Sequence, residues 1–298
     1  MKTRRIATFF ICLCLAGKVF AQINTDSIPL IMADSLKAVY IYADTGTAIN
    51  QVDAKGRKQG LWQKKYSNGV IRYRGHFYNN NPVGVFKYYY NNDSVESIVT
   101  YCDKGKVAYA TAFYENGGVL SLGKYVNHLQ DSIWVYYDPN TKLYKKEQYV
   151  LGKKEGKSIV FFPNGNVVEI TTWHNNMQNG LWKRFFDNGQ LNVETTYING
   201  VLDGPAKIYA EGNPDEPEIW GNYKNDRKNG RWIYVNQNTG AADTVVYKNG
   251  QLADKKYRLT QQKMDSLGIK YQPLQRKLDE PGSLQDEYKM GNQGGGGR

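Results

Sequence analysis

The feature that most constrains the fold of this chain is a tandem repeat of 24 residues. The best preserved unit runs from Gly180 to Asp203. Steps of 24 residues from Gly180 in either direction, with one insertion of two residues, reach Gly, Ala or Ser each time. These first positions of the units are Gly60, Gly84, Ala108, Ser132, Gly156, Gly180, Gly204 and Gly230. A fixed period of this length predicts stacked supersecondary units rather than a globular fold.

Two further positions of the unit keep the same register. The ninth position is Asn in seven of the eight units, and only the seventh unit departs from this, with Gly212. The eighteenth position is aromatic in every unit: Phe77, Tyr101, Tyr125, Tyr149, Trp173, Tyr197, Tyr223 and Tyr247. An aromatic side chain in the same place of every unit predicts that this position packs against its neighbours.

Each unit has the pattern of a β-hairpin. Residues 181–186 and 190–198 are rich in aromatic and β-branched types, and the second run alternates with a period of two, as strands do. Turn dipeptides follow both runs, at Asn188–Gly189 and Asn199–Gly200. Pro precedes the Asn of the first turn in two units, which favours a type I turn with a bulged Gly. The sequence therefore predicts an all-β, elongated, single-sheet antiparallel meander of about eight hairpins over residues 56–252.

The third position of the unit alternates between large and small side chains from the second unit onward. Equivalent positions of successive hairpins share a face and lie about 9.6 Å apart, so a ring needs a small neighbour in order to lie flat. This favours a packed core over an exposed row of rings. The alternative is a candidate binding surface that includes the aromatic members Trp62, Phe86, Trp134, Trp182 and Trp232.

The N-terminus has the pattern of a secretory signal peptide over residues 1–21. Basic residues precede an apolar stretch from Ile6 to Gly17, and Ala21 offers a cleavage site. Cleavage would remove four basic residues and no acidic ones, so the formal charge of +11 would fall by four. Residues 22–55 do not match the repeat and are interpreted as a cap over the first hairpin's edge.

After the repeats the chain changes character, and residues 253–298 are predicted to form a basic, flexible tail. Residues 260–268 favour a short helix, and the closing Gly-rich segment favours disorder. A solvated tail is one interpretation, and a docking arm for an acidic partner or an anionic surface is the other. Lys255, Lys256 and Arg258 complete the candidate binding surface on the second interpretation.

The sequence offers no catalytic constellation. The mature chain would keep only Cys102, so it could form no internal disulfide. His76, His128 and His174 occupy different positions of separate units and predict no metal site. No phosphate-binding loop or nucleophile elbow is present, and acidic residues such as Glu147 fall at unmatched positions. We therefore expect no enzymatic activity, no cofactor and no metal.

The repeats resemble the MORN-type repeat variant found in the bacterial YwqK-like family. The best matches are Gly60–Trp62 with Asn68–Gly69, and Gly180–Trp182 with Asn188–Gly189 and Asn199–Gly200. The resemblance covers about two thirds of the chain. It implies a ribbon of β-hairpins with a binding or scaffolding role, and some members of the family carry an antitoxin label.

Together these features predict an exported scaffold that binds a protein partner in the bacterial envelope, at the periplasm, the outer membrane or outside the cell. An alternative is a module that binds glycan or another envelope polymer through exposed Tyr and Trp. An antitoxin-like protein is a second alternative. The positive net charge of the chain suits binding to an anionic glycan or membrane surface. No nucleic acid partner is expected, because export would separate the protein from it.

Overall fold

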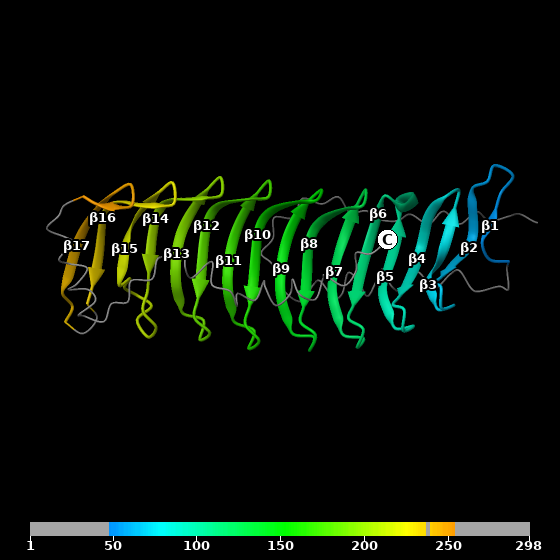
Figure 1. The fold of residues 1–298 in the computed structure, drawn as a ribbon, viewed down its shortest axis with the longest axis horizontal. Helices are drawn as coiled ribbons and strands as arrows, with labels where there is room; N and C mark the ends of the chain where they lie inside the picture. Colours follow the sequence, from blue (N-terminus) through cyan, green and yellow to red (C-terminus); the bar gives the residue numbers. More distant parts are fainter. Residues whose placement is uncertain (1–47, 237–238, 254–298) are drawn as a thin grey trace, which may run out of the picture. The chain divides into compact units, whose positions relative to one another are not determined.

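The structure is a computed structural model, and it describes residues 48–236 and 239–253 (Figure 1). The predicted signal peptide, most of the predicted cap and almost all of the predicted basic tail lie outside these residues. The chain divides into two compact units, one reaching Val201 and the other beginning at Leu202. We describe each unit by itself.

The first unit contains a run of β-strands and a single turn of 3-10 helix, with no α-helix among its described residues. The elements are β1 (Gln51–Val52), β2 (Lys58–Lys65), β3 (Ile71–Tyr78), β4 (Asn81–Tyr89), β5 (Val95–Cys102), η1 (Asp103–Gly105), β6 (Val107–Phe113), β7 (Val119–Val126), β8 (Leu129–Tyr137), β9 (Leu143–Val150), β10 (Lys153–Phe161), β11 (Val167–His174), β12 (Met177–Phe185) and β13 (Leu191–Ile198). Each strand from β1 to β12 pairs antiparallel with the strand that follows it in the chain.

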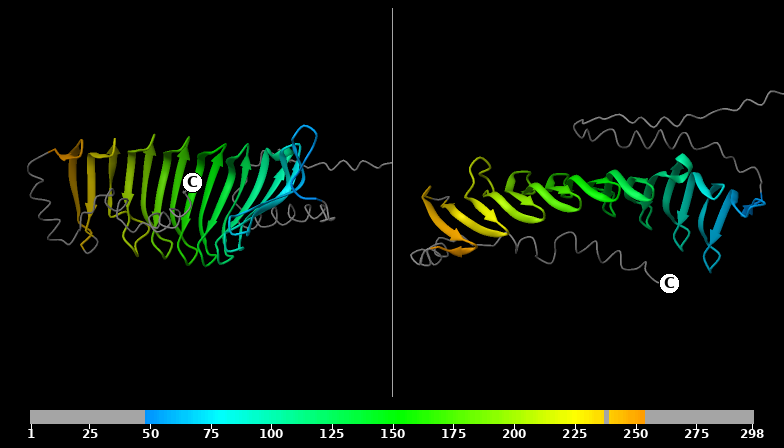
Figure 2. Two further views of the ribbon diagram at one scale, coloured as in Figure 1. Left: turned by 45° about the vertical axis from the view of Figure 1, so that its right-hand side comes forward. Right: turned by 90° about the horizontal axis from the view of Figure 1, so that it is seen from above.

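The second unit continues the same pattern. Its strands are β14 (Val201–Ile208), β15 (Ile219–Lys224), β16 (Arg227–Val235), β17 (Ala242–Lys248) and β18 (Gln251–Leu252). They also pair antiparallel in chain order. Figure 2 shows successive strands side by side in further views. The predicted all-β antiparallel meander of hairpin repeats is confirmed.

Two kinds of turn alternate along the meander. In the first hairpin, the Gly69 amide donates to the Tyr66 carbonyl at 3.1 Å, and Gly69 has a φ of 89°. The strand register shifts beside this turn, between Lys64 and Lys65. A type I turn with a bulged Gly has these properties, as the sequence predicts. At the opposite edge Asn79 and Asn80 both have positive φ, 51° and 68°, which is the backbone of a tight primed turn.

The core of the first unit is a row of side chains that crosses the sheet at the third and sixteenth positions of the units. Strand register places Phe86 opposite Val99, Val99 opposite Ala110, and Ala110 opposite Gly123. The row therefore alternates residues from successive strands on one face. We call this face the packed face.

Large and small residues compensate each other within the row. A Cβ added to Gly123 would lie 2.1 Å from the ring of Trp134, and a Cβ added to Gly75 would lie 2.4 Å from the ring of Phe86. In the second unit a Cβ added to Gly221 would lie 2.4 Å from the ring of Trp232. Each of these rings lies flat on the backbone of the preceding strand because the sixteenth position there has no side chain.

The aromatic eighteenth positions close the packed face around these rings. Tyr125 meets Trp134 edge-on with ring centroids 4.8 Å apart, and in the second unit Tyr223 meets Trp232 at 5.0 Å. Edge-to-face contacts of this kind stabilise aromatic pairs beyond the area that they bury. Such contacts let a sheet one layer thick bury tryptophan.

Candidate interaction surface

Four of the five aromatic residues of the predicted binding surface are buried. The exposed fractions are 2% for Phe86, 4% for Trp134, 2% for Trp182 and 0% for Trp232. These rings cannot form an exposed stacking row in the described fold, because they are buried: Phe86, Trp134 and Trp232 each cover a glycine of the preceding strand, and Trp182 lies opposite Thr171. The structure thus corrects this part of the candidate surface and supports the packed-core interpretation of the alternating position.

Trp62 is the one member of that set that is only half-buried. Its indole Nε1 donates to the carbonyl oxygens of Gln51 at 3.1 Å and Gln59 at 3.2 Å. The ammonium of Lys58 lies 4.6 Å from the centroid of its ring, within cation–π range. The polar edge and one face of this ring are therefore engaged by the protein itself. The three basic members Lys255, Lys256 and Arg258 lie outside the described residues.

Lys58 belongs to a recurring cation–π position that sequence reasoning missed. The same position, two residues before the start of a unit, holds Lys154 and Lys228. Lys154 lies 4.7 Å from the ring of Trp173, and Lys228 lies 4.3 Å from the ring of Trp232. A lysine in a hairpin repeat resembles an ordinary solvated charge, so its place over a ring is visible only from the fold.

Lys228 is the most deeply buried of these lysines, with 8% of its surface exposed. Its ammonium donates to the hydroxyl of Tyr234 at 3.0 Å. Burial lowers the pKa of Lys228 to about 7, because the charged form loses its hydration. The rings of Trp232, Tyr234 and Tyr247 act in the opposite direction, since they attract the ammonium.

Glu147 is a second charge that the repeat pattern did not foretell. It takes the sixteenth position of its unit, opposite Trp134 and Ser158, and only 4% of its side chain is exposed. Its Oε1 lies 2.8 Å from Lys145 Nζ and 2.7 Å from Lys154 Nζ. Burial would raise the pKa of this carboxyl, but the two ammonium groups outweigh burial and hold the pKa below its usual range.

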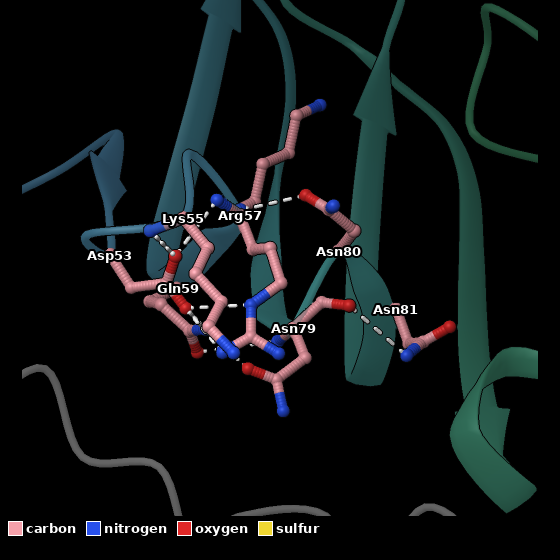
Figure 3. Close-up of polar contacts among 8 residues, drawn as sticks. Asp53, Lys55, Arg57, Gln59, Asn79, Asn80 and Asn81 are labelled. Atoms are coloured by element: carbon pink, nitrogen blue, oxygen red, sulfur yellow. Dashed lines mark hydrogen bonds and ion pairs between the residues drawn. The ribbon is translucent and has the colours of Figure 1, made fainter.

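The N-terminal end of the first unit carries a polar cluster around Asp53 (Figure 3). Asp53 Oδ1 accepts from the amides of Lys55 at 2.9 Å and Arg57 at 3.0 Å, and its Oδ2 accepts from Arg57 Nε at 2.8 Å. These hydrogen bonds hold the pKa of Asp53 well below its usual range, and the bond from the Arg57 side chain contributes the most. Gln59 Nε2 bonds both Asp53 and Asn79, at 3.1 Å and 2.6 Å. The cluster fixes one turn against the next, which is a structural role.

The opposite face of the first unit, away from the packed face, exposes large apolar side chains. Six of them lie within β8–β13 or the turn between β9 and β10, with exposed fractions from 43% to 51%: Leu129, Val150, Leu151, Met177, Leu181 and Ile198. All but Leu181 lie next to the tight turns that join one unit to the next. Lys153 and His174 lie between Val150 and Met177 along this edge, so the apolar side chains form two groups. Grouped exposed apolar side chains mark interaction surfaces more often than single scattered ones do.

Among the described residues, no three His, Cys, Asp or Glu side chains are placed to hold a metal ion. His174 instead lies 2.9 Å from Glu155, at an exposed place on β11. Within the same part of the chain, none of the elements is a helix long and apolar enough to cross a membrane.

The comparison with protein families supports the repeat type. The MORN repeat variant family matches residues 58–80, 82–103, 154–175 and 178–199. The first two matches cover β2–β5 and the last two cover β10–β13. The chain therefore carries four segments that match this repeat variant, at hairpins on both sides of the middle of the first unit.

The other two comparisons do not point to a particular protein or fold. A search of curated proteins finds no match. Among solved structures, the crystal structure of TcdB2-TccC3-Cdc42 is similar at 11% sequence identity over 64% of this chain. The match spans only 14% of that other chain and has a TM-score of 0.18, so it indicates no shared fold.

Proposed function

We propose that this protein is an exported, non-catalytic repeat scaffold that binds a protein partner in the bacterial envelope. The observation that carries the proposal is the exposed apolar set on β8–β13, on a sheet whose other face is closed by its own aromatic rings. MORN repeats in general mediate contacts with proteins or membranes, and they are scaffolds rather than enzymes. Membership of the YwqK-like family belongs to the same proposal and rests on the resemblance of the repeat units.

Export is proposed from the sequence of residues 1–21, where basic residues, an apolar stretch and a small-residue site follow in order. The partner would then be met in the periplasm, at the outer membrane or outside the cell. Binding to an anionic glycan or membrane surface stays a secondary proposal, which rests on the basic composition.

A protein partner is favoured over a glycan because of where the rings lie. Stacking of sugar rings needs exposed aromatic faces, and Phe86, Trp134, Trp182 and Trp232 offer none. The exposed large side chains of β8–β13 are aliphatic instead. Aliphatic side chains gain by excluding water from a protein contact, whereas they give a sugar no stacking platform.

Affinity capture from the producing cell tests this proposal. The full chain would carry a C-terminal tag, and envelope fractions would be cross-linked before purification. We expect a mature N-terminus at Gln22 and one protein recovered in stoichiometric amount, while a variant without residues 2–21 recovers neither. Retention of the intact chain in the cytoplasm, or turnover of an envelope polymer by the purified protein, would contradict the proposal.

A further inference from the structure

An apolar row follows one edge of the first unit, and we define it as Leu129, Val150, Met177 and Ile198. Leu129 and Met177 begin β8 and β12, whereas Val150 and Ile198 end β9 and β13. Each of these four side chains is therefore the outermost strand residue beside a tight turn. Leu151 stands in the turn next to Val150, and Leu181 lies farther along β12.

All four members of the row point to the face opposite the packed face. Tyr149 and Tyr197, the residues just before Val150 and Ile198, are 8% and 7% exposed and belong to the packed face. Because successive strand residues alternate between faces, Val150 and Ile198 lie on the other side. They are 48% and 46% exposed, so the apolar surface there is open to solvent.

Two basic residues occupy the middle of the row. Strand register pairs Val150 with Lys153 on β10 and pairs Met177 with His174 on β11. Across β8–β13 the outermost residues are thus two apolar, one lysine, one histidine and two apolar. Lys153 Nζ lies 3.3 Å from the amide oxygen of Asn175, a neutral partner.

Two carboxylates on this face of β8–β13 pair with lysines, Asp131 with Lys124 at 3.2 Å and Glu194 with Lys183 at 2.7 Å. A third, Glu155, lies 2.9 Å from His174 Nδ1 and also interacts electrostatically with Lys153. Lys153 and the exposed Lys157, both on β10, have no ion pair within the described residues. A partner with acidic side chains opposite β10 would therefore find two exposed lysines that hold no close ion pair within the described residues.

We propose that the apolar row docks an amphipathic α-helix of a partner protein, apolar at both ends of its contact face and acidic in the middle. The proposal rests on the proposed function and names the class of segment that the scaffold recognises. It assigns Leu129 and Val150 to one apolar end of the helix, Met177 and Ile198 to the other, and Lys153 to the acidic middle.

The spacing of the row favours a helix over an extended peptide. Neighbouring strands lie about 4.8 Å apart, and a helix presents one side chain per turn of about 5.4 Å along one face. An extended peptide presents side chains on one face every 6.6 Å or so, a mismatch about three times larger per step. The row crosses six strands over roughly 24 Å, which corresponds to about 16 helical residues.

A synthetic peptide serves as the probe. It would have 18 residues, with Leu at the contact positions of its outer turns, Glu at those of its two central turns, and a fluorescent label. Binding to the full mature chain would be followed by anisotropy. The double change Met177→Ser with Ile198→Ser should weaken binding by about tenfold or more, because half-exposed apolar side chains lose their contact.

Charge reversal provides the specific test. Lys153→Glu should weaken binding of the Glu peptide several-fold and strengthen binding of a matched peptide with central Lys. Lys87→Glu is the control, since Lys87 is an exposed lysine on β4 and the variant has the same net charge. Circular dichroism would confirm that each variant keeps its strand content.

Each outcome decides the inference. Equal peptide binding by the wild type and the row variants would overturn it, as would loss of binding in Lys87→Glu to the same extent as in Lys153→Glu. Absence of peptide binding, with row-dependent binding to vesicles of phosphatidylglycerol and phosphatidylethanolamine, would assign the row to a membrane instead. If an envelope protein is captured equally by the row variants, the proposed function stands and the row inference fails. If the row binds the peptide but capture recovers no protein, the proposed function fails alone.

Discussion

The compensation between Trp134 and Gly123 makes a quantitative prediction about how the packed face is built. The Cβ of any residue other than glycine at position 123 would overlap the Trp134 ring at 2.1 Å, and this ring is 4% exposed. One hairpin earlier, the same two positions hold Val99 and Ala110, which face each other in register. The chain therefore contains both solutions to the same packing problem, a ring over glycine and a valine beside alanine.

Substitutions at positions 123 and 134 that replace the ring over glycine with the valine–alanine pair should show strong coupling between their effects on unfolding free energy. Trp134→Ala removes a buried ring and should cost about 3–5 kcal/mol of unfolding free energy. Gly123→Val overfills the site and should cost about 1–3 kcal/mol or more, because the ring rests on a strand backbone. In the double variant the valine occupies space that the ring leaves, as in the Val99 and Ala110 pair. We expect it to be destabilised by only about 2–3 kcal/mol, a coupling of at least about 1 kcal/mol.

Urea unfolding of the four proteins in this cycle, followed by tryptophan-independent far-UV circular dichroism, measures the coupling. Hydrogen exchange would show whether the loss is centred on β7 and β8, as nearest-neighbour packing in a repeat array requires. Additive effects within about 0.3 kcal/mol would refute the reasoning, because residues that do not share a site behave additively.

Three further predictions concern other parts of the chain. Thr195 is fully buried and its Oγ1 has no hydrogen-bond partner. The equivalent position of the last unit holds Val245, so Thr195→Val should stabilise the protein by about 1–2 kcal/mol in urea unfolding. Lys228 has a pKa of about 7 in the fold against 10.5 for an unburied lysine, so the cost of burying its charge is fully present below pH 7. As pH rises from 7 to 10.5 only the unfolded state holds that proton, and stability should increase by up to about 1.4 kcal/mol per pH unit. Lys228→Met should abolish this slope, and a slope that persists would contradict the assignment. Deletion of residues 255–298 should weaken partner capture at low salt and leave the remaining capture less sensitive to salt, because charges in solution attract over only about 8 Å at physiological salt. Capture that the deletion leaves unchanged at both low and high salt would remove the tail from the binding surface.

The repeat period accounts for what could be predicted from the sequence. It placed the strands, both turns, the bulged-Gly type of the first turn and the alternation of Phe86 with Ala110, because these depend only on local preference and on which residues share a face. The charges inside the packed face escaped prediction. Glu147 and Lys228 carry the side-chain types expected of a solvated strand, and only the strand register shows that one faces two ammonium groups and the other three rings.

The apolar row escaped prediction for a different reason. The sequence pattern gave the phase of each strand, so the face of Val150 or Ile198 could be deduced. What it could not give was exposure, since a strand residue opposite the core is covered or open according to what its neighbours place over it. On that face Val135 and Lys146, which pair with each other within β8 and β9, are only 2% and 7% exposed, whereas Val150 and Ile198 at the strand ends are 48% and 46% exposed.

The two faces of the first unit are stabilised in different ways, and this difference favours the open face for binding. On the packed face, rings such as Trp134 and Trp182 gain their contacts from adjacent strands, so a partner would have little apolar surface left to cover there. On the other face the apolar row is left open, and the exposed Lys153 makes a hydrogen bond to Asn175 but no close ion pair within the described residues. Substitutions on the packed face should therefore alter stability and leave affinity unchanged in whatever protein still folds, whereas substitutions in the row should alter affinity with little effect on stability. A partner contact on the packed face would reverse that relation, and the combined stability and binding measurements on Trp134→Ala and Met177→Ser distinguish the two cases.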